Sequence, residues 1–171
     1  MLVLHSSWAA AFLRISGLIG LAFALAFVAG VICEPAHAKL PEPYAWRVKH
    51  ARVLRQEHRI VRVAVKQLGV PYLWGGESRS GFDCSGLVRY VYRRIGISLP
   101  HYTVSQFLHG RRVPRGRLKP GDLVFFSGLA HVGLYIGHGL LVHAPHTGSR
   151  VRVARLASFG GSWSGARRLI R

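Results

Sequence analysis

The spacing of apolar residues changes once along the chain, and this change constrains the fold more than any other feature of the sequence. Between residues 84 and 95, apolar side chains recur at the spacing of one helix face, which predicts a helix packed on a core. After residue 120, short apolar runs alternate with glycine-rich turns, a pattern typical of antiparallel strands. Helices that precede a series of strands predict an α+β fold.

Local signals predict where these elements begin and end. Asp83 is expected to cap a helix that begins at Cys84, and Gly96 to close it. An earlier helix is expected to begin near Glu57 and to end at Gly69. Strands are expected at 123–126, 132–136, 140–143, 151–155 and 168–170, with residues 160–165 as a loop before the last one.

An apolar run near the N-terminus indicates export. Residues 15–32 are almost all apolar, Arg14 precedes them, and an A-x-A triplet ending at Ala38 follows. This order is typical of a secretory signal, so residues 1–38 are predicted to be removed. Two alternatives stay open. The run is long enough to remain as a membrane anchor, and Cys33 is a candidate for lipid attachment, although Ile32 stands where lipoprotein signals have a small residue.

The sequence after the signal divides into two parts. Residues 39–56 are polar and basic, and Pro41 and Pro43 favour an extended start, so this stretch is predicted to be a linker. Residues 57–171 are predicted to form one domain in the periplasm or cell envelope. We expect a monomer, since the domain is small.

The chain is strongly basic. Lys and Arg total 24 against six Asp and Glu, which gives a net charge of +18. The predicted signal contains one base and one acid, so its loss leaves this charge unchanged. A surface of this kind attracts polyanions. The six acids occur singly along the sequence, which disfavours a carboxylate-pair mechanism or a calcium loop.

Cys84 is the only cysteine expected in the exported protein, because Cys33 leaves with the signal. It lies in the first turn of a predicted helix, where free N–H groups and the helix dipole stabilise a thiolate. Cys84 is therefore a candidate nucleophile. The alternative is an inert cysteine buried at the start of a core helix.

A nucleophilic thiol needs a base, and the base needs an orienting partner. His131 begins one predicted strand and His143 ends the next, so a hairpin is expected to bring the two imidazoles together. His146 is a substitute for the third position, and His101 is a candidate for lining a cleft. Cys84, His131 and His143 also form an alternative zinc set. No close ligand pair such as H-x-x-x-H occurs among them, so no metal or cofactor is predicted.

Four segments carry a distinctive pattern in a fixed order. They are G-V-P-Y-L-W-G-G-E-S-R-S-G-F-D-C-S-G-L-V-R-Y-V-Y at 69–92, R-L-K-P-G-D-L-V-F-F at 117–126, H-V-G-L-Y-I-G at 131–137 and L-V-H-A-P at 141–145. With this order and spacing, the chain from about residue 57 to its end resembles the NlpC/P60 family of cell-wall cysteine peptidases. The resemblance implies a papain-like α+β fold, in which the cysteine helix packs on an antiparallel sheet.

The resemblance also implies roles for individual residues. The nucleophile of the family falls on Cys84, its base on His131 and its third polar residue on His143. Tyr72 corresponds to a cleft tyrosine thought to assist the oxyanion.

Asp83 and Ser85 flank the nucleophile in the family's D-C-S-G motif. Together with Tyr72, they are expected to contribute to substrate binding or to the oxyanion site. One departure concerns the segment after Leu-Pro, where the family often has an arginine and this chain has His101 and Tyr102. The stretch 109–119 is also unusually basic.

Members of this family typically hydrolyse the bond between γ-D-glutamate and the diamino acid in peptidoglycan stem peptides. The resemblance therefore implies an exported cysteine endopeptidase with these peptides as substrate. An N-acetylmuramoyl-L-alanine amidase or an acyltransferase on the same fold is one alternative, and a non-catalytic polyanion-binding protein is another. The basic surface is expected to bind an anionic cell-wall polymer, whereas export separates the chain from nucleic acid.

Overall fold

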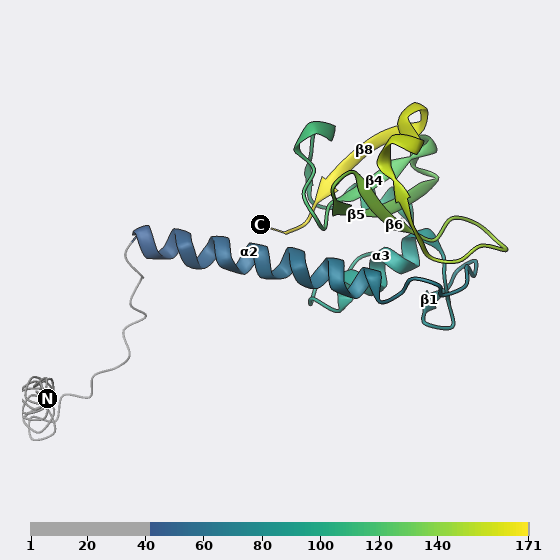
Figure 1. The fold of residues 1–171 in the computed structure, drawn as a ribbon, viewed down its shortest axis with the longest axis horizontal. Helices are drawn as coiled ribbons and strands as arrows, with labels where there is room; N and C mark the ends of the chain where they lie inside the picture. Colours follow the sequence, from purple (N-terminus) through teal and green to yellow (C-terminus); the bar gives the residue numbers. More distant parts are fainter. Residues whose placement is uncertain (1–41, 171) are drawn as a thin grey trace, which may run out of the picture. The chain divides into compact units, whose positions relative to one another are not determined.

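The computed structural model describes residues 42–170 of the 171-residue chain. The predicted secretory signal, its cleavage site after Ala38 and the start of the predicted linker lie outside the described residues. The part from Glu42 onward is one unit, in which helices precede a sheet (Figure 1). Within residues 42–170, no helix is both long and apolar enough to cross a membrane.

The helices and a small hairpin come first. The helices are α2 (Glu42–Val65), α3 (Cys84–Arg93) and α4 (Thr103–Phe107). The hairpin joins β1 (Glu77–Ser78) to β2 (Gly81–Phe82). In the unit that Figure 1 displays, α3 contacts both α2 and the sheet, so it links the two layers.

The later strands form one antiparallel sheet. They are β3 (Arg111–Arg112), β4 (Leu123–Phe126), β5 (His131–Gly137), β6 (Leu140–His143), β7 (Arg152–Arg155) and β8 (Trp163–Arg168). Their order in the sheet is β3-β8-β4-β5-β6-β7. This architecture confirms the α+β fold, and β5 and β6 are the adjacent antiparallel strands expected for the histidine hairpin.

Strand β4 is buried on both faces. Leu123 and Phe125 belong to a hydrophobic cluster that also contains Leu87 of α3. Val124 and Phe126 point to the opposite face and belong to a second cluster. Successive strand residues face opposite sides, so burial of both faces explains the unbroken apolar run. Each such side chain contributes about 1.5–3 kcal/mol on full burial, which fixes β4 and the neighbouring start of β5.

Residues 42–56 differ from the linker that the sequence predicted over 39–56. They form the first part of α2, which continues to Val65. Pro43 does not prevent this, because the first turn of a helix does not need the N–H that proline lacks. Val53 packs against the same cluster as the buried Ile60 and Ala64. The apolar face of the helix therefore extends into the predicted linker.

The last strand begins earlier than predicted. Strand β8 starts at Trp163 and ends at Arg168, so part of the expected loop is strand and the predicted strand 168–170 overlaps it by one residue. Gly165 has φ +146°, and a Cβ there would lie 3.0 Å from the Phe107 ring. The close approach of Phe107 favours glycine at this position. The glycines among residues 160–165 predicted a loop, although residues 163–165 belong to the strand.

Candidate active site

The thiol of Cys84 lies at the N-terminal end of α3. Asp83 caps the helix, as predicted, because its side chain accepts a hydrogen bond of 2.6 Å from the N–H of Gly86. Cys84 is a free cysteine. Burial raises the pKa of the thiol, and the Asp83 charge adds to this effect, whereas hydrogen bonds from the N–H groups of Val132, Ser85 and Cys84 itself act to lower it. The net direction is upward, so the thiol is protonated at neutral pH.

The two histidines contact each other across β5 and β6. His131 Nε2 lies 2.9 Å from His143 Nδ1, which confirms the expected proximity. The strand pairing sets His143 opposite Gly133, so His131 approaches it diagonally. A Cβ at Gly133 would lie 2.8 Å from the Leu141 side chain, and the glycine leaves this face open to both rings.

Both imidazoles are held in their neutral form. Burial lowers the pKa of His131 to about 4. Burial also lowers the pKa of His143 to about 3, with smaller contributions from the charges of His131, Arg152 and His146. Phe159, in the short helix η3 (Leu156–Ser162), stacks on the His131 ring and meets the His143 ring edge to face. An aromatic neighbour offers no charge to stabilise an imidazolium, which agrees with the direction of both shifts.

The thiol and the histidine pair meet at the first peptide of β5. The N–H of Val132 lies near enough to the Cys84 thiol to act on its pKa, in the lowering direction, and His131 is the preceding residue. Among the hydrogen bonds of the described residues, none joins the thiol to the His131 ring directly. Because Nε2 of His131 is bonded to His143, Nδ1 is the ring nitrogen left for the thiol. Catalytic hydrogen bonds are often long in unliganded enzymes and tighten when substrate binds.

The thiol opens into a cleft of about 530 Å³. Tyr72, Asp83 and Ser85 line this cleft together with Cys84, and so does His101. Burial raises the pKa of Tyr72, and the nearby charges of Cys84 and Asp83 raise it further. The structure therefore brings all the predicted binding residues to one cavity, with a Tyr72 hydroxyl that keeps its proton.

One wall of the cleft is a strained turn just before His131. Gly128, Leu129 and Ala130 line the cleft, and the first two belong to the short helix η2 (Ser127–Leu129). Ser127 has φ 54° and Leu129 has φ 73°, values that cost energy for residues with a side chain. Gly128, between them, adopts a positive φ without this cost because it has no side chain. Its N–H donates a hydrogen bond to Ser164 Oγ of β8 at 3.0 Å. This contact ties the turn to the sheet and sets where β5 begins.

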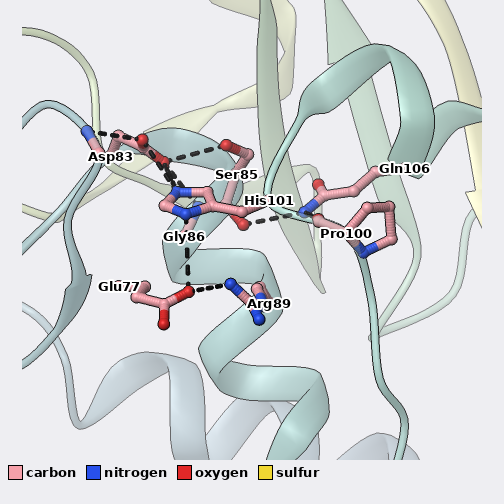
Figure 2. Close-up of polar contacts among 9 residues, drawn as sticks. Glu77, Asp83, Ser85, Gly86, Arg89, Pro100, His101 and Gln106 are labelled. Atoms are coloured by element: carbon pink, nitrogen blue, oxygen red, sulfur yellow. Dashed lines mark hydrogen bonds and ion pairs between the residues drawn. The ribbon is translucent and has the colours of Figure 1, made fainter.

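The cap of α3 is joined to the opposite wall of the cleft. His101 Nε2 lies 3.0 Å from both carboxylate oxygens of Asp83, and its Nδ1 lies 3.5 Å from Glu77 Oε2 (Figure 2). Glu77 in turn pairs with Arg89 of α3. The imidazole of His101 therefore lies between two carboxylates. His101 was expected to line a cleft, but its partners could not be predicted from the sequence.

Gln106 is a structural residue that the sequence did not single out. It is fully buried in α4, and its Nε2 donates to the carbonyl oxygens of Ser85 at 2.9 Å and Pro100 at 2.8 Å. These bonds fasten the segment that carries His101 to the start of α3, as Figure 2 shows. Glutamine in a short helix has no distinctive spacing, so no signal in the sequence identified this role.

The sequence left two alternatives open, namely His146 as the partner of His131 and a zinc site. His146 lies on the surface, where its Nδ1 contacts the carbonyl of Thr147 at 2.9 Å, so His143 and not His146 bonds His131. Across residues 42–170, no group of three or more His, Cys, Asp or Glu side chains is arranged to hold a metal ion.

Comparison with known proteins agrees with this geometry. The NlpC/P60 family profile matches residues 69–165. Peptidoglycan endopeptidase RipA of Mycobacterium tuberculosis is 40% identical over 116 residues, which cover 59% of this chain and 25% of that protein. Probable endopeptidase p60 of Listeria monocytogenes is 45% identical over 92 residues, covering 52% of this chain and 19% of that protein.

A solved structure extends the match to a whole domain. The crystal structure of the NlpC/p60 domain of peptidoglycan hydrolase SagA superposes with a TM-score of 0.62 and 37% identity, covering 66% of this chain and 97% of that one. The chain spans a quarter or less of the length of the two curated relatives. The match to the profile and to the complete SagA domain shows that the chain belongs to the NlpC/P60 family.

Proposed function

We propose that this protein is an exported cysteine endopeptidase that cleaves peptidoglycan stem peptides between γ-D-glutamate and the diamino acid. The observation that carries the proposal is the free thiol at the start of α3, which opens into a cleft and lies near Val132, the residue after His131 of the His131–His143 pair. The names of the relatives, peptidoglycan endopeptidase and peptidoglycan hydrolase, support the substrate class.

In the proposed reaction, His131 acts as a general base at the moment of attack. The thiol is protonated and the imidazole neutral at rest, because burial raises the pKa of Cys84 and lowers that of His131. His131 Nδ1 accepts the thiol proton as the sulfur bonds to the carbonyl carbon. The C–N bond then breaks, and His131 returns the proton to the leaving amine. Water hydrolyses the thioester, which releases the new carboxyl group and restores the thiol.

The negative charge that develops on the carbonyl oxygen needs donors near Cys84. Backbone N–H groups at the start of α3, including that of Cys84, are suited to this because the first N–H groups of a helix have no partner within the helix and favour negative charge. The Tyr72 hydroxyl is a further donor on the same cleft, and its raised pKa keeps it protonated. Preorganised donors of this kind contribute about 3–4 kcal/mol each to the transition state.

His143 is proposed to orient His131 and fix its tautomer. For Nδ1 of His131 to accept a proton, its Nε2 must donate to Nδ1 of His143. His143 then carries its own proton on Nε2, which is buried and has no hydrogen-bond partner. An unpaired buried donor costs about 1–3 kcal/mol of folding free energy. A role of His143 in catalysis would explain why this cost is retained.

Mass spectrometry of digested peptidoglycan fragments tests the proposal. The chain from residue 39 onward is expected to release products cut after γ-D-glutamate, and Cys84→Ala is expected to release none. Free stem peptides with bare glycan would instead identify an amidase on the same machinery. Retained cleavage by Cys84→Ala, or no cleavage of any fragment by the wild type, would contradict the thiol mechanism.

Export through residues 1–38 is proposed together with this function, because the substrate lies outside the cytoplasm. N-terminal sequencing of the protein recovered from the cell envelope tests it. A first residue of Lys39 is expected. A blocked or intact N-terminus in the membrane fraction would instead support an anchor through residues 15–32.

A further inference from the structure

Four basic side chains of α2 and that of Lys66, which directly follows the last helical residue Val65, form a line. Arg52, Arg55, Arg59, Arg62 and Lys66 follow one another at steps of three and four residues, so they share one face of the helix. All five are exposed. We call this set the α2 basic stripe. From its first to its last residue it extends about 21 Å along the helix axis.

No carboxylate of the described residues neutralises the stripe. Glu57, on the same helix, is buried and only 8% exposed. The ion pairs within residues 42–170 use Glu77, Asp83 and Asp122, and their cationic partners lie outside α2. Like charges three and four residues apart repel and destabilise a helix. An external anion would relieve this repulsion.

The stripe borders a hollow separate from the active site. Its four arginines and Ile95, which follows α3, line a cavity of about 440 Å³. Arg93 and Arg94 precede Ile95 and are also exposed. None of the residues that line this hollow lines the cleft of Cys84. An anion bound here would therefore leave the cleft open.

We propose that the α2 basic stripe binds a linear polymer of the cell envelope that carries a phosphate group in each unit and is not a nucleic acid. Arginine offers planar, paired donors that match phosphate oxygens, and a straight row of cations fits a chain of evenly spaced anions better than a single compact ion. The identity of the polymer as one of the cell envelope rests on the proposed export. Bound in this way, the stripe holds the enzyme at its substrate while the cleft stays free.

The packing of α2 favours a polymer over a lipid surface. A helix that lies in a membrane interface inserts an apolar face next to its basic one. In α2 that apolar face is covered, since Ile60 and Ala64 are fully buried in the main hydrophobic cluster. The apolar side chains of α2 that stay exposed are those of Trp46, Val48, Leu54 and Val65, so the apolar surface left for insertion is smaller than that of a free amphipathic helix.

Binding of long-chain inorganic polyphosphate tests the proposal. The probe is titrated into the chain from residue 39 onward, which contains both hydrophobic clusters of the described residues. With about 0.7 counterions released per contact, five contacts predict a loss of affinity of about 100-fold between 50 and 200 mM salt. The stripe variant replaces Arg52, Arg55, Arg59 and Arg62 by glutamine, which retains helix propensity.

The control variant removes the same charge elsewhere. It replaces Arg111, Arg112, Arg117 and Arg155 by glutamine, all of them exposed and outside α2. The stripe variant is expected to bind at least tenfold more weakly and to lose most of the salt dependence, whereas the control keeps both. Equal losses in the two variants would overturn the proposal in favour of diffuse charge.

Binding to phospholipid vesicles and to double-stranded DNA distinguishes the other possible ligands of the stripe. Stronger binding to vesicles containing anionic phospholipid than to polyphosphate, lost in the stripe variant, would overturn the proposal in favour of a membrane site. Preference for double-stranded DNA over polyphosphate would overturn it in favour of nucleic acid. Binding is repeated with Cys84→Ala, and cleavage of a soluble stem peptide is measured in parallel. If the wild type cleaves the peptide but does not bind polyphosphate, only the stripe is contradicted. If it binds polyphosphate through the stripe but cleaves no peptide, only the proposed peptidase is contradicted.

Discussion

His131 Nε2 lies 2.9 Å from His143 Nδ1, and this bond occupies one of the two ring nitrogens of His131. The other nitrogen, Nδ1, is the one left for the thiol. The second ring nitrogen of His143, Nε2, is buried and has no hydrogen-bond partner among residues 42–170. Nδ1 of His131 is therefore the ring nitrogen that can accept the Cys84 proton. Substitutions of single residues test the role of each histidine.

Replacement of His143 should reduce turnover without removing the base. His143→Ala is expected to lower kcat by about 10²-fold, the lower end of the range for losing acid–base assistance, because the His131 ring loses its orienting contact. His143→Asn retains an acceptor for His131 Nε2 and should recover part of this loss. Steady-state kinetics on a soluble stem peptide measure both variants. Equal kcat values for His143→Ala and His143→Asn would show that the hydrogen bond is not used.

The rate should depend on pH in a way that distinguishes a neutral pair from an ion pair. Burial lowers the pKa of His131 to about 4, so its neutral, proton-accepting form persists down to that pH. The ratio kcat/KM is expected to stay level from pH 8 to pH 5 and to fall only near pH 4. An acid limb near pH 6.5, the ordinary value for histidine, would contradict the neutral pair.

Stability should fall as the solution becomes acidic. His131 titrates near 6.5 when unfolded and at about 4 when folded, so the unfolded chain binds more protons between these values. The contribution of His131 is complete above pH 6.5 and is lost as the pH falls toward 4. Between pH 6.5 and 5 the loss is about 2 kcal/mol for this residue.

Urea denaturation at pH 7 and at pH 5 measures this effect. His131→Gln should show a smaller loss of unfolding free energy over that interval than the wild type. His58→Gln, which changes an exposed histidine of α2, should behave as the wild type. Identical losses in all three proteins would show that His131 is not the group responsible.

Gln106 should matter to both stability and substrate binding. Gln106→Leu removes the donor to the carbonyls of Ser85 and Pro100 and leaves them without this bond, at a cost of about 1–3 kcal/mol for each buried group. We expect a lower unfolding free energy and a raised KM, because the segment that carries His101 is released from α3.

Gln67→Leu is the matched control for that variant. Gln67, two residues after the end of α2, is also buried. Its Nε2 donates back to the carbonyl of Val63 at 2.8 Å, its Oε1 accepts from Arg79 Nε at 3.4 Å, and neither bond reaches the segment that carries His101. Its replacement should lower stability and leave KM unchanged for the protein that remains folded. A raised KM in both variants would assign the effect to general destabilisation.

The sequence predicts most of the site because its signals are local. An aspartate followed by a cysteine and a helix-spaced apolar pattern is enough to predict the cap and the position of the thiol. The histidines follow from a hairpin, whose register is set by the short turn between β5 and β6. In each case the residues that decide the geometry lie within a few positions of the residue in question.

The contacts that were not predicted join distant segments. His101 and Asp83 are 18 residues apart, and Arg89 and Glu77 are 12 apart, with no periodic pattern between them. The helical start of α2 depends on packing of Val53 against the core, which outweighs the extended tendency expected from two prolines. In strand β8, Gly165 fits the close approach of the Phe107 ring, a contact with a residue 58 positions earlier in the chain.

The protonated state of Cys84 also affects the resistance of the enzyme to oxidation. Peroxide and other oxidants attack the thiolate much faster than the thiol, and burial raises the pKa of this thiol above its ordinary value. In the oxidising exterior to which the proposed signal would deliver it, a lone cysteine has no internal disulfide partner to protect it. The half-buried, protonated thiol therefore resists oxidation, and its sulfur becomes reactive only when a proton acceptor and a substrate are both in place.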